Sequence, residues 1–248
     1  MDHLTWKAKI GLVVVSSATV PEGRYPRVAP RDVGFFTSRM LLRGRGVAAV
    51  AAMEQQAARA IEELASVPVD AIAYCCTVSG ALRGVVGDRH FCQTMTQRWG
   101  IPVTSTMLAV TEALHHLALR RVVVTSPYPG SHHEAERVYL AHAGIEAIAM
   151  HGMGLETGQA FATVTPEAIV QFALETWDDT ADGLFISCMN FDALPAVQVL
   201  EERLGKPVVT SHAATLWRVL ALAGIDTPIG GYGRLLAQGS RCTVVKAG

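Results

Sequence analysis

The sequence predicts an α/β fold of two pseudo-symmetric, flavodoxin-like lobes, each with a mainly parallel sheet flanked by helices. Three observations support this prediction. Short apolar runs alternate with segments of helical periodicity along the chain, which is typical of parallel sheets covered by helices. Segments of the first half recur in the second. Half of the 248 residues are hydrophobic, which is enough for a large buried core.

The expected elements alternate in order along the chain. Short apolar runs rich in β-branched residues predict strands at 10–15, 69–75, 101–105, 120–126, 145–150, 182–188 and 207–211. Helical periodicity predicts helices at 47–65, 107–119, 131–144, 165–179, 195–205 and 212–224. Gly144 suits the end of one helix, and Thr165 followed by Pro166 suits the start of the next.

The two halves of the chain match one another in three places. "VVVSSAT" (13–19) matches "VVVTSPY" (122–128), "YCCT" (74–77) matches "ISCM" (186–189), and "GIPVTST" (100–106) matches "GKPVVTS" (205–211). The offsets are 109, 112 and 105 residues, in the same order. We therefore predict a lobe one of residues 1–112 plus 212–248, which carries Cys76, and a lobe two of residues 113–211, which carries Cys188.

Cys76 and Cys188 end the two matching strands. Ligands bind beyond the carboxyl ends of the strands in open parallel sheets, so the active site is expected between the lobes, with one thiol on each side. Such a pair can take a proton from one face of a carbon and deliver one to the other, or add a thiolate to one face. Helices are expected to begin after both cysteines, which would lower the pKa of each thiol.

Composition excludes several classes of function. The net charge of −1 and pI of about 6.7, with no basic stripe, argue against nucleic-acid binding. No apolar run is long enough to span a membrane, and no signal peptide is recognised, so a cytoplasmic protein is expected. No CxxC or Cys/His ligand spacing predicts a metal, and the Gly-rich segment 152–161 lacks nucleotide-binding spacing. We therefore predict neither metal nor cofactor; segment 152–161 is a candidate mobile flap.

Several longer segments resemble a known family. "AIAYCCTVSGALRG" (71–84), "TSPY" (125–128), "GKPVVTSHAATLWRVLALAGI" (205–225) and "GYGRLL" (231–236), with the paired cysteines and the internal repeat, resemble the aspartate/glutamate racemase superfamily. Within it they are similar to the maleate cis-trans isomerase and arylmalonate decarboxylase branch. The likeness covers nearly the whole chain and implies a cofactor-independent enzyme of two α/β lobes.

The resemblance also implies roles for the two cysteines. In maleate isomerases the first cysteine attacks an alkene carbon, the second acts as acid and base, and the adduct rotates before elimination. Cys76 and Cys188 match these two positions. In the decarboxylases the first position is glycine, so cysteine at both positions favours isomerase or racemase chemistry.

The same resemblance implies residues that contact the substrate. Tyr128 matches a substrate-contacting tyrosine, and Thr77 with the backbone N–H groups that follow each cysteine, including those of Val78 and Met189, would bind a carboxylate or oxyanion. One position departs from the family. Maleate isomerases carry "SSN" after the first strand, with the Asn holding a substrate carboxylate, whereas this chain has "SSAT" with Ala18 there. The decarboxylases also have a small residue at that place.

Some polar residues admit two interpretations. Side chains at strand ends either line the cleft or cap the next element; these are Ser16, Ser17, Thr19, Thr104, Ser105, Thr210 and Ser211. His212 is a candidate carboxylate donor or general acid, because it follows a strand at the start of a helix. Arg83 either pairs with a second carboxylate or lies on the surface.

The remaining candidates are given structural interpretations. We expect the histidine pairs 115–116 and 132–133 on solvated helix faces, and Cys75, Cys92 and Cys242 in structural positions. Strand alternation points Cys75 away from Cys76.

The function predicted from these patterns is a cofactor-independent isomerase of a small carboxylic or dicarboxylic acid, nearest to maleate cis-trans isomerase. A racemase or an arylmalonate-type decarboxylase on the same fold is the alternative, and a non-catalytic carboxylate-binding protein is a third. The substrate acid is the expected ligand, with no nucleic acid or membrane partner, and a homo-oligomer is expected.

Overall fold

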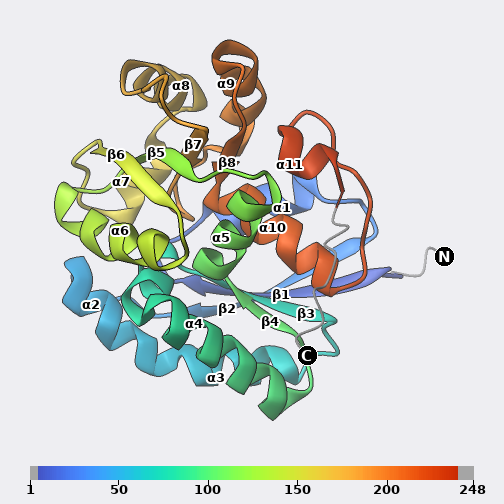
Figure 1. Ribbon diagram of the computed structural model, residues 1–248. Helices are drawn as coiled ribbons and strands as arrows, with labels where there is room; N and C mark the ends of the chain where they lie inside the picture. Colours follow the sequence, from blue (N-terminus) through green and yellow to red (C-terminus); the bar gives the residue numbers. More distant parts are fainter. Residues whose placement is uncertain (1–4, 240–248) are drawn as a thin grey trace.

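The computed structural model describes residues 5–239 and contains two four-stranded parallel sheets (Figure 1). Sheet A has the order β2-β1-β3-β4 and is formed by β1 (Ala8–Val15), β2 (Val33–Met40), β3 (Ala71–Cys75) and β4 (Val103–Ser105). Sheet B has the order β6-β5-β7-β8 and is formed by β5 (Arg121–Ser126), β6 (Glu146–Gly152), β7 (Gly183–Ile186) and β8 (Val208–Thr210). The two orders are identical after a shift of four strands, so the predicted duplicated α/β fold is confirmed.

The helices of the first half cover sheet A. On one face lie α2 (Gly46–Met53), the short 3-10 turn η1 (Glu54–Gln56) and α3 (Ala57–Ala65), which pack in one apolar cluster with β1, β2 and β3. The opposite face carries α1 (Val20–Val28) and α10 (Ser211–Leu222). The long helix α4 (Thr77–Trp99) runs from β3 toward β4.

The helices of the second half surround sheet B. They are α5 (Thr106–His116), α6 (His133–His142) after the turn η2 (Gly130–His132), α7 (Gly158–Thr163), α8 (Pro166–Glu175), and α9 (Val197–Leu204) after the turn η3 (Leu194–Ala196). The short helix α11 (Arg234–Ala237) follows α10. No helix within residues 5–239 is both long and apolar enough to cross a bilayer.

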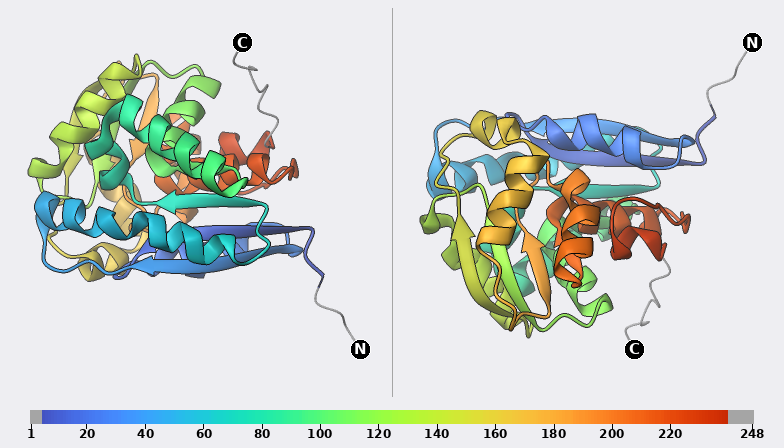
Figure 2. Two further views of the ribbon diagram at one scale, coloured as in Figure 1. Left: turned by 90° about the horizontal axis from the view of Figure 1, so that it is seen from below. Right: turned by 90° about the horizontal axis from the view of Figure 1, so that it is seen from above.

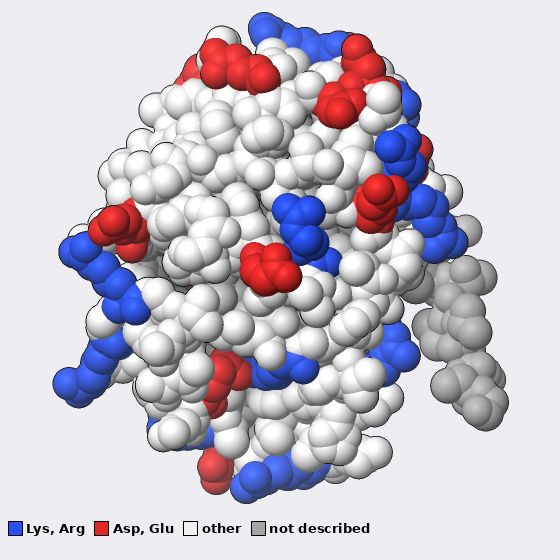
Figure 3. All heavy atoms as spheres, turned by 60° about the vertical axis from the view of Figure 1, so that its left-hand side comes forward, with Lys and Arg blue, Asp and Glu red and all other residues white. Residues whose placement is uncertain are grey.

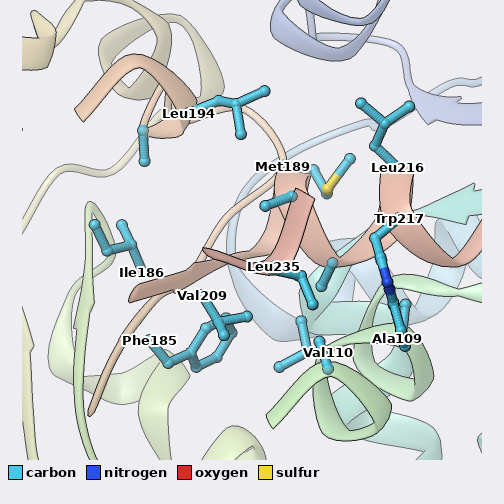
Figure 4. Packing of buried hydrophobic residues seen from close by; sticks show 14 of the residues in the cluster. Ala109, Val110, Phe185, Ile186, Met189, Leu194, Val209, Leu216, Trp217 and Leu235 are labelled. Atoms are coloured by element: carbon cyan, nitrogen blue, oxygen red, sulfur yellow. The ribbon is translucent and has the colours of Figure 1, made fainter. Parts of the chain in front are cut away.

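Helices α5 and α10 join the two sheets. They pack against each other, and α10 also contacts β3, β4 and β8. Figure 2 shows the sheets as separate layers whose strands run in different directions, and Figure 4 shows Val110 of α5 next to Phe185 of sheet B, with Trp217 of α10 next to Ala109 of α5. One continuous apolar cluster therefore extends from sheet A through both helices into sheet B. The division into the two predicted lobes stays a prediction.

Local sequence signals account for several helix starts. Ser105, Thr165 and Thr210 each precede a helix and accept a hydrogen bond from a backbone N–H of its first turn. Each therefore satisfies one of the donors that a helix leaves free at its start. For Ser105 and Thr210 the capping interpretation is the one that the structure supports.

Three elements of the first half were not predicted from the sequence, and one was predicted too long. Helix α1 contains Pro26, β2 alternates weakly, and α4 contains three glycines, of which Gly84 has a φ of 66° and breaks the helical geometry. Proline and glycine weaken the helix signal in the sequence, and weak alternation weakens the strand signal. Tertiary packing stabilises these elements despite their weak local propensity. The predicted helix 47–65 is divided by η1 into α2 and α3.

Gly80 tests the close packing of α4 on α5. A Cβ added there would lie 2.9 Å from the Cβ of Met107, so we expect Gly80→Ala to lower the free energy of unfolding by about 1–3 kcal/mol, although alanine is normally the better helix former. The matched control is Gly87→Ala in the same helix, where an added Cβ would lie 3.6 Å from the Cβ of Arg83, an ordinary contact distance. It should gain about 0.5–1 kcal/mol. Urea unfolding measures both, and a stabilised Gly80→Ala variant would contradict the packing.

Candidate active site

A cavity of about 350 Å³ lies where chain segments leave both sheets. Its walls come from the segments after β1, β3, β5 and β7, from the segment 42–50 around the start of α2, and from residues 156–161 at the start of α7. The four strands are the two central strands of each sheet. The cavity is thus at the carboxyl ends of the strands, between the two sheets, where parallel α/β folds place their ligands.

Cys76 enters this cavity from sheet A. It follows β3 directly and is the N-cap residue of α4, so the helix begins after it as predicted. The residue is buried, and the hydroxyl of Ser79, one turn into the helix, lies 3.1 Å from its sulfur. Burial raises the pKa of the Cys76 thiol, while hydrogen bonds from the side chain and backbone of Ser79 act in the opposite direction.

Cys188 enters the same cavity from sheet B. Its φ of 108° is unusual for a residue with a side chain, and its backbone N–H donates to the Ser211 hydroxyl at 3.0 Å. Burial raises the pKa of this thiol to about 12, against the opposing hydrogen bonds of Tyr128 and the Asn190 N–H. The expectation that a helix begins after Cys188 is wrong, because α9 starts only at Val197; the chain turns sharply instead.

The two thiols interact electrostatically across the cavity. Both line it, and the charge of a Cys76 thiolate contributes to the raised pKa of Cys188. Cys75, between Tyr74 and Cys76 in sequence, has its side chain in the cluster on the opposite face of sheet A. The two cysteines that the repeat singles out therefore meet at one cleft, and their neighbour is part of the core.

Tyr128 forms one wall beside Cys188. Its ring is buried, stacks on His132 with the ring centroids 5.4 Å apart, and meets Phe161 edge-on. Burial, followed by the charge of Cys188, raises the pKa of the hydroxyl well above its usual value. The hydroxyl therefore stays protonated at neutral pH and can donate a hydrogen bond to the sulfur or to a ligand.

Asn190 is a site residue that the sequence interpretation missed. Its Oδ1 accepts hydrogen bonds from the backbone N–H groups of Thr19 at 2.9 Å and Val20 at 3.3 Å. Its Nδ2 donates to the carbonyl oxygens of Ser17 and Gly158, at 3.3 and 2.6 Å. The side chain thus joins the segment after β7 to the first loop of sheet A, residues 16–19, which follows β1. The signal in the sequence was its place two residues after Cys188.

Gly158 makes this connection possible. A Cβ at this position would lie 2.7 Å from the Ser17 hydroxyl oxygen and 3.2 Å from the Ser17 Cβ, so glycine lets the start of α7 approach the loop after β1 without displacing Ser17. Thr157 caps the helix by accepting the N–H of Ala160. The segment 156–161, part of the candidate flap, is therefore a wall of the cavity with defined contacts.

Most of the predicted substrate-binding residues line the cavity. These are Ser17, Thr77, Val78, Tyr128 and Met189, with Ala18 beside them. Thr77 and Val78 are the first residues of α4, where backbone N–H groups lack acceptors within the helix. Such groups are available to an anionic ligand.

Two predicted substrate-binding residues lie outside the lining. The Ser16 hydroxyl accepts the N–H of Leu42 and holds the loop after β2. His212 is fully buried on α10, and its Nε2 lies 2.9 Å from the carbonyl oxygen of Met189. Burial lowers the pKa of His212 to about 4, so a neutral imidazole donates to that carbonyl and supports the cavity from behind.

Two structural interpretations from the sequence were wrong. His132 and His133 do not lie on a solvated helix face: His132 lines the cavity, and His133 is buried with its Nε2 2.7 Å from the Ser126 hydroxyl. Arg83 is only 14% exposed at its side chain and forms ion pairs with Glu54 and Asp88, so it is neither a surface residue nor directed at the cavity. Cys92 is buried as expected, and Cys242 lies outside the described residues.

The rest of the lining is mostly apolar and carries little charge. Val15, Leu42, Val50 and Phe161 contribute apolar surface, and the exposed pair Arg45–Glu156 joins the loop before α2 to the loop before α7 at 3.2 Å. Figure 3, turned toward the side of α2, α6 and α7, shows sparse charged side chains of both signs. Within residues 5–239 no group of three or more His, Cys, Asp or Glu is arranged to hold a metal.

Glu136 of α6 is a buried carboxyl close to this site. It is fully buried, accepts a hydrogen bond from the hydroxyl of Ser187, the residue before Cys188, and has its pKa raised to about 7 by burial. Its charge would oppose formation of a thiolate at Cys188. It therefore helps to keep Cys188 protonated.

Comparisons with known proteins agree with this geometry. The model of the arylmalonate decarboxylase family matches residues 10–236. A maleate isomerase of Pseudomonas putida is 27% identical over 247 residues, which cover 94% of this chain and 99% of that protein. The arylmalonate decarboxylase of Bordetella bronchiseptica is 29% identical over 159 residues, or 63% of this chain and 66% of that protein.

Solved structures give the same result for the fold. A maleate isomerase from Pseudomonas putida S16 with maleate has a TM-score of 0.88 at 24% identity, covering 93% of this chain and 98% of that one. A maleate cis-trans isomerase of Nocardia farcinica with a covalently bound succinylcysteine intermediate also has a TM-score of 0.88, at 25% identity, covering 94% of this chain and 99% of that one.

Asn190 tests how the two halves are held together. Asn190→Ala removes four hydrogen bonds to backbone groups of both halves, and we expect the free energy of unfolding to fall by about 2 kcal/mol. Asn190→Asp should lose at least as much, because a carboxylate would face two carbonyl oxygens. The control is Gln171→Ala, whose exposed amide bonds only Glu175. An Asn190→Ala variant within about 0.5 kcal/mol of the wild type would contradict this role.

Proposed function

The chain belongs to the arylmalonate decarboxylase family, and we propose that it is a cofactor-independent isomerase of a small carboxylic or dicarboxylic acid, nearest in chemistry to maleate cis-trans isomerase. One observation carries this proposal above all. Cys76 and Cys188, each following a central strand of a different sheet, line one cavity. The decarboxylases have the same fold, but the resemblance implies that their branch has glycine at the position of Cys76.

Cys76 is the proposed nucleophile. Its thiolate would form a C–S bond with one alkene carbon of the substrate, and the electron pair of the double bond would pass to the neighbouring carbon next to a carboxylate. Cys188 would then deliver its proton to that carbon. The product is a saturated thioether adduct, which is the kind of species that the Nocardia farcinica relative holds as succinylcysteine. Rotation about the new single bond, return of the proton to Cys188 and loss of the Cys76 thiolate give the other isomer.

The electrostatics of the two thiols support this division of roles. With a pKa of about 12, Cys188 carries its proton at neutral pH and is suited to donate it. Burial also raises the pKa of Cys76, but two hydrogen bonds from Ser79 and the charge of Arg83 oppose this shift, and Cys76 is therefore proposed as the thiol that ionises. Nucleophilic attack requires the ionised form.

The proposed site for the substrate carboxylate is the start of α4. The free N–H groups of Thr77 and Val78 and the Thr77 hydroxyl line the cavity there, and the positive end of the helix favours negative charge. Negative charge builds up on this carboxylate when the neighbouring carbon becomes a carbanion. Donors held in place for that moment typically contribute about 3–4 kcal/mol each to catalysis. Tyr128 is proposed to donate to the Cys188 sulfur or to the ligand.

A second candidate function is favoured by the wall around Ala18. Ala18 offers no side-chain donor, and Val15, Leu42 and Val50 line the cavity near the ends of β1 and β2. This wall suits an apolar substituent. A racemase of an acid with such a substituent would use the same thiols, with one removing the α-proton and the other delivering a proton on the opposite face. Loss of CO₂ from a substituted malonate would need only the delivery.

The homo-oligomer expected from the sequence remains part of this proposal. Val86 of α4 is 83% exposed, and Leu82, on the other side of the break at Gly84, is also exposed. Light scattering on the purified protein distinguishes a monomer from larger assemblies.

Removing either thiol tests the two-cysteine mechanism. We expect Cys76→Ala and Cys188→Ala each to lower kcat for conversion of the active substrate by about 10³-fold, with melting temperatures close to that of the wild type. Proton NMR of maleate, fumarate and related acids measures turnover. The matched control is Cys92→Ala, because Cys92 is also a buried cysteine but lies on α4 outside this cavity. Wild-type turnover in either of the first two variants would refute the mechanism.

Deuterium incorporation decides between the two candidate reactions. Dicarboxylic acids, arylmalonates and chiral 2-substituted acids are incubated with the protein in D₂O and followed by NMR and chiral chromatography. Isomerisation of an alkene diacid need not place deuterium on carbon if Cys188 returns the proton it gave. Racemisation and decarboxylation must place solvent deuterium on the reacting carbon. Activity confined to acids with an apolar substituent would favour the second candidate.

A further inference from the structure

A chain of polar side chains leads from the Cys76 sulfur to the surface behind sheet A. The Ser79 hydroxyl oxygen lies 3.1 Å from the Cys76 sulfur, and the Tyr74 hydroxyl lies 3.4 Å from the Ser79 oxygen. The Tyr74 hydroxyl also bonds directly to Oε1 of Glu54. Two side chains, those of Ser79 and Tyr74, therefore connect a buried thiol to the Glu54 carboxylate, which is 21% exposed at its side chain.

The fold places these groups in line. Tyr74 and Cys76 are two residues apart at the end of β3, so both side chains lie on the face of sheet A that packs against α2 and α3. Ser79 is in the first turn of α4, and Glu54 is in η1 between α2 and α3. The chain of groups thus runs on the side of β3 that is away from α10.

The inner members of this chain are sealed from solvent. Tyr74 and Ser79 have no exposed surface, and Cys76 is 7% exposed. Burial raises the pKa of Tyr74 well above its usual value, so its hydroxyl is neutral. A neutral hydroxyl that both accepts and donates can pass a proton on without becoming charged.

We propose that Ser79, Tyr74 and Glu54 form a proton relay that carries the Cys76 proton to solvent without opening the cavity. The proposal rests on the proposed role of Cys76 as the thiol that ionises. A relay is needed because a bound substrate would cover the Cys76 thiol on the cavity side and separate it from water there. The relay gives that proton an exit on the other side.

Each step of the relay moves one proton by one hydrogen bond. The S–H proton of Cys76 passes to the Ser79 oxygen, the Ser79 proton passes to the Tyr74 oxygen, and the Tyr74 proton passes to Glu54. The outcome is a Cys76 thiolate and a protonated Glu54, with no net change of charge. In this state Tyr74 donates to Ser79 and Ser79 donates to the sulfur. Glu54 then releases the proton to water.

Arg83 holds the outer end of the relay in place. Its guanidinium pairs with Glu54 and with Asp88, the latter at 3.0 Å. It also lies 4.4 Å from the ring centroid of Tyr74 and 3.7 Å from that of Phe91. These contacts fix both the carboxylate and the tyrosine ring, and Arg83 is therefore a positioning residue for the relay.

Cys188 has different surroundings. Its sulfur meets the Tyr128 hydroxyl and the Asn190 N–H, and Tyr128 is only 4% exposed. The groups that act on Cys76 include Ser79 and Arg83 from α4, Glu54 from η1, Tyr74 and Cys75 from β3, and, across the cavity, Cys188 and Tyr128. The relay therefore makes the two thiols unequal: Cys76 exchanges its proton with water during turnover, whereas Cys188 keeps its proton for the substrate.

Breaking the relay at two places provides the test. Tyr74→Phe removes an inner member, and Glu54→Ala removes the exposed end. We expect each to lower kcat by about tenfold or more with KM nearly unchanged. Added imidazole, a small proton carrier, should restore kcat for Glu54→Ala, because it can replace the exposed carboxylate. It should not restore kcat for Tyr74→Phe, because the gap is buried.

Tyr139→Phe is the matched control. Tyr139 is also a buried tyrosine bonded to a carboxylate, Asp88, at 3.1 Å, but among residues 5–239 no path of side-chain hydrogen bonds leads from it to Cys76 without passing through Arg83. Its kcat should stay within about twofold of the wild type if the proton path is what matters. Melting temperatures of all three variants show whether any loss reflects unfolding.

Alkylation of Cys76 separates failure of the relay from failure of the proposed function. The rate of reaction with iodoacetamide, followed by peptide mass spectrometry between pH 6 and 10, reports the thiolate. Removing the Glu54 charge should make Cys76 react faster at a given pH, since that charge raises the thiol pKa, while kcat falls. Unchanged kcat in Tyr74→Phe and Glu54→Ala, with activity still abolished by Cys76→Ala, would overturn the relay alone. Activity that survives Cys76→Ala would overturn the proposed function itself.

Discussion

The four hydrogen bonds of the Asn190 amide hold the site together, because they join the segment that follows Cys188 to the first loop of the other sheet. The core beneath them is shared through α5 and α10, which fixes the sheets relative to each other. The Arg24–Asp192 ion pair also links the segment after Cys188 to helix α1 of the first half. Small changes there would alter the gap between the thiols, and proximity effects in catalysis depend steeply on such distances.

The duplicated fold supplies symmetric positions, and the surroundings make the two thiols different. Cys76 begins a helix and receives the Ser79 hydroxyl, whereas Cys188 adopts a φ of 108° in a sharp turn beside Tyr128 and close to the buried Glu136. Burial raises the pKa of both thiols, and a nearby carboxyl group adds to the shift at each, Glu136 at Cys188 and Glu54 at Cys76, while the Arg83 guanidinium acts against the shift at Cys76. One thiol is thereby suited to ionise and the other to retain its proton. An enzyme in which one thiol attacks the substrate and the other donates a proton needs this difference.

The internal repeat explains why so much of the fold and the cysteine pair could be predicted from sequence. A match such as "YCCT" with "ISCM" reports equivalent strand ends, and strand ends meet in parallel sheets. The missed features depend on tertiary contacts instead. His133 is buried because the end of β5 places Ser126 beside it. Arg83 turns inward because Glu54 and Asp88 pair with its guanidinium. Asn190 accepts a hydrogen bond from Thr19, which is 171 residues away in the sequence. No local pattern encodes such partners.

The charge balance of the cavity bears on which acid fits. Ala18 has no polar side-chain atom, and the Asn190 amide is already used by backbone groups. Among the described lining residues Arg45 is the one cation, and Glu156 neutralises it. A dianion would therefore have one carboxylate at the start of α4 and would need Arg45 to leave Glu156 for the other. Because an exposed ion pair contributes only about 0–1 kcal/mol, that exchange costs little. A monoanion with an apolar substituent needs no exchange, since the wall near Ala18 accepts it directly. A dianion would thus need the mouth of the cavity to rearrange, whereas a monoanion with an apolar substituent would leave the Arg45–Glu156 pair in place.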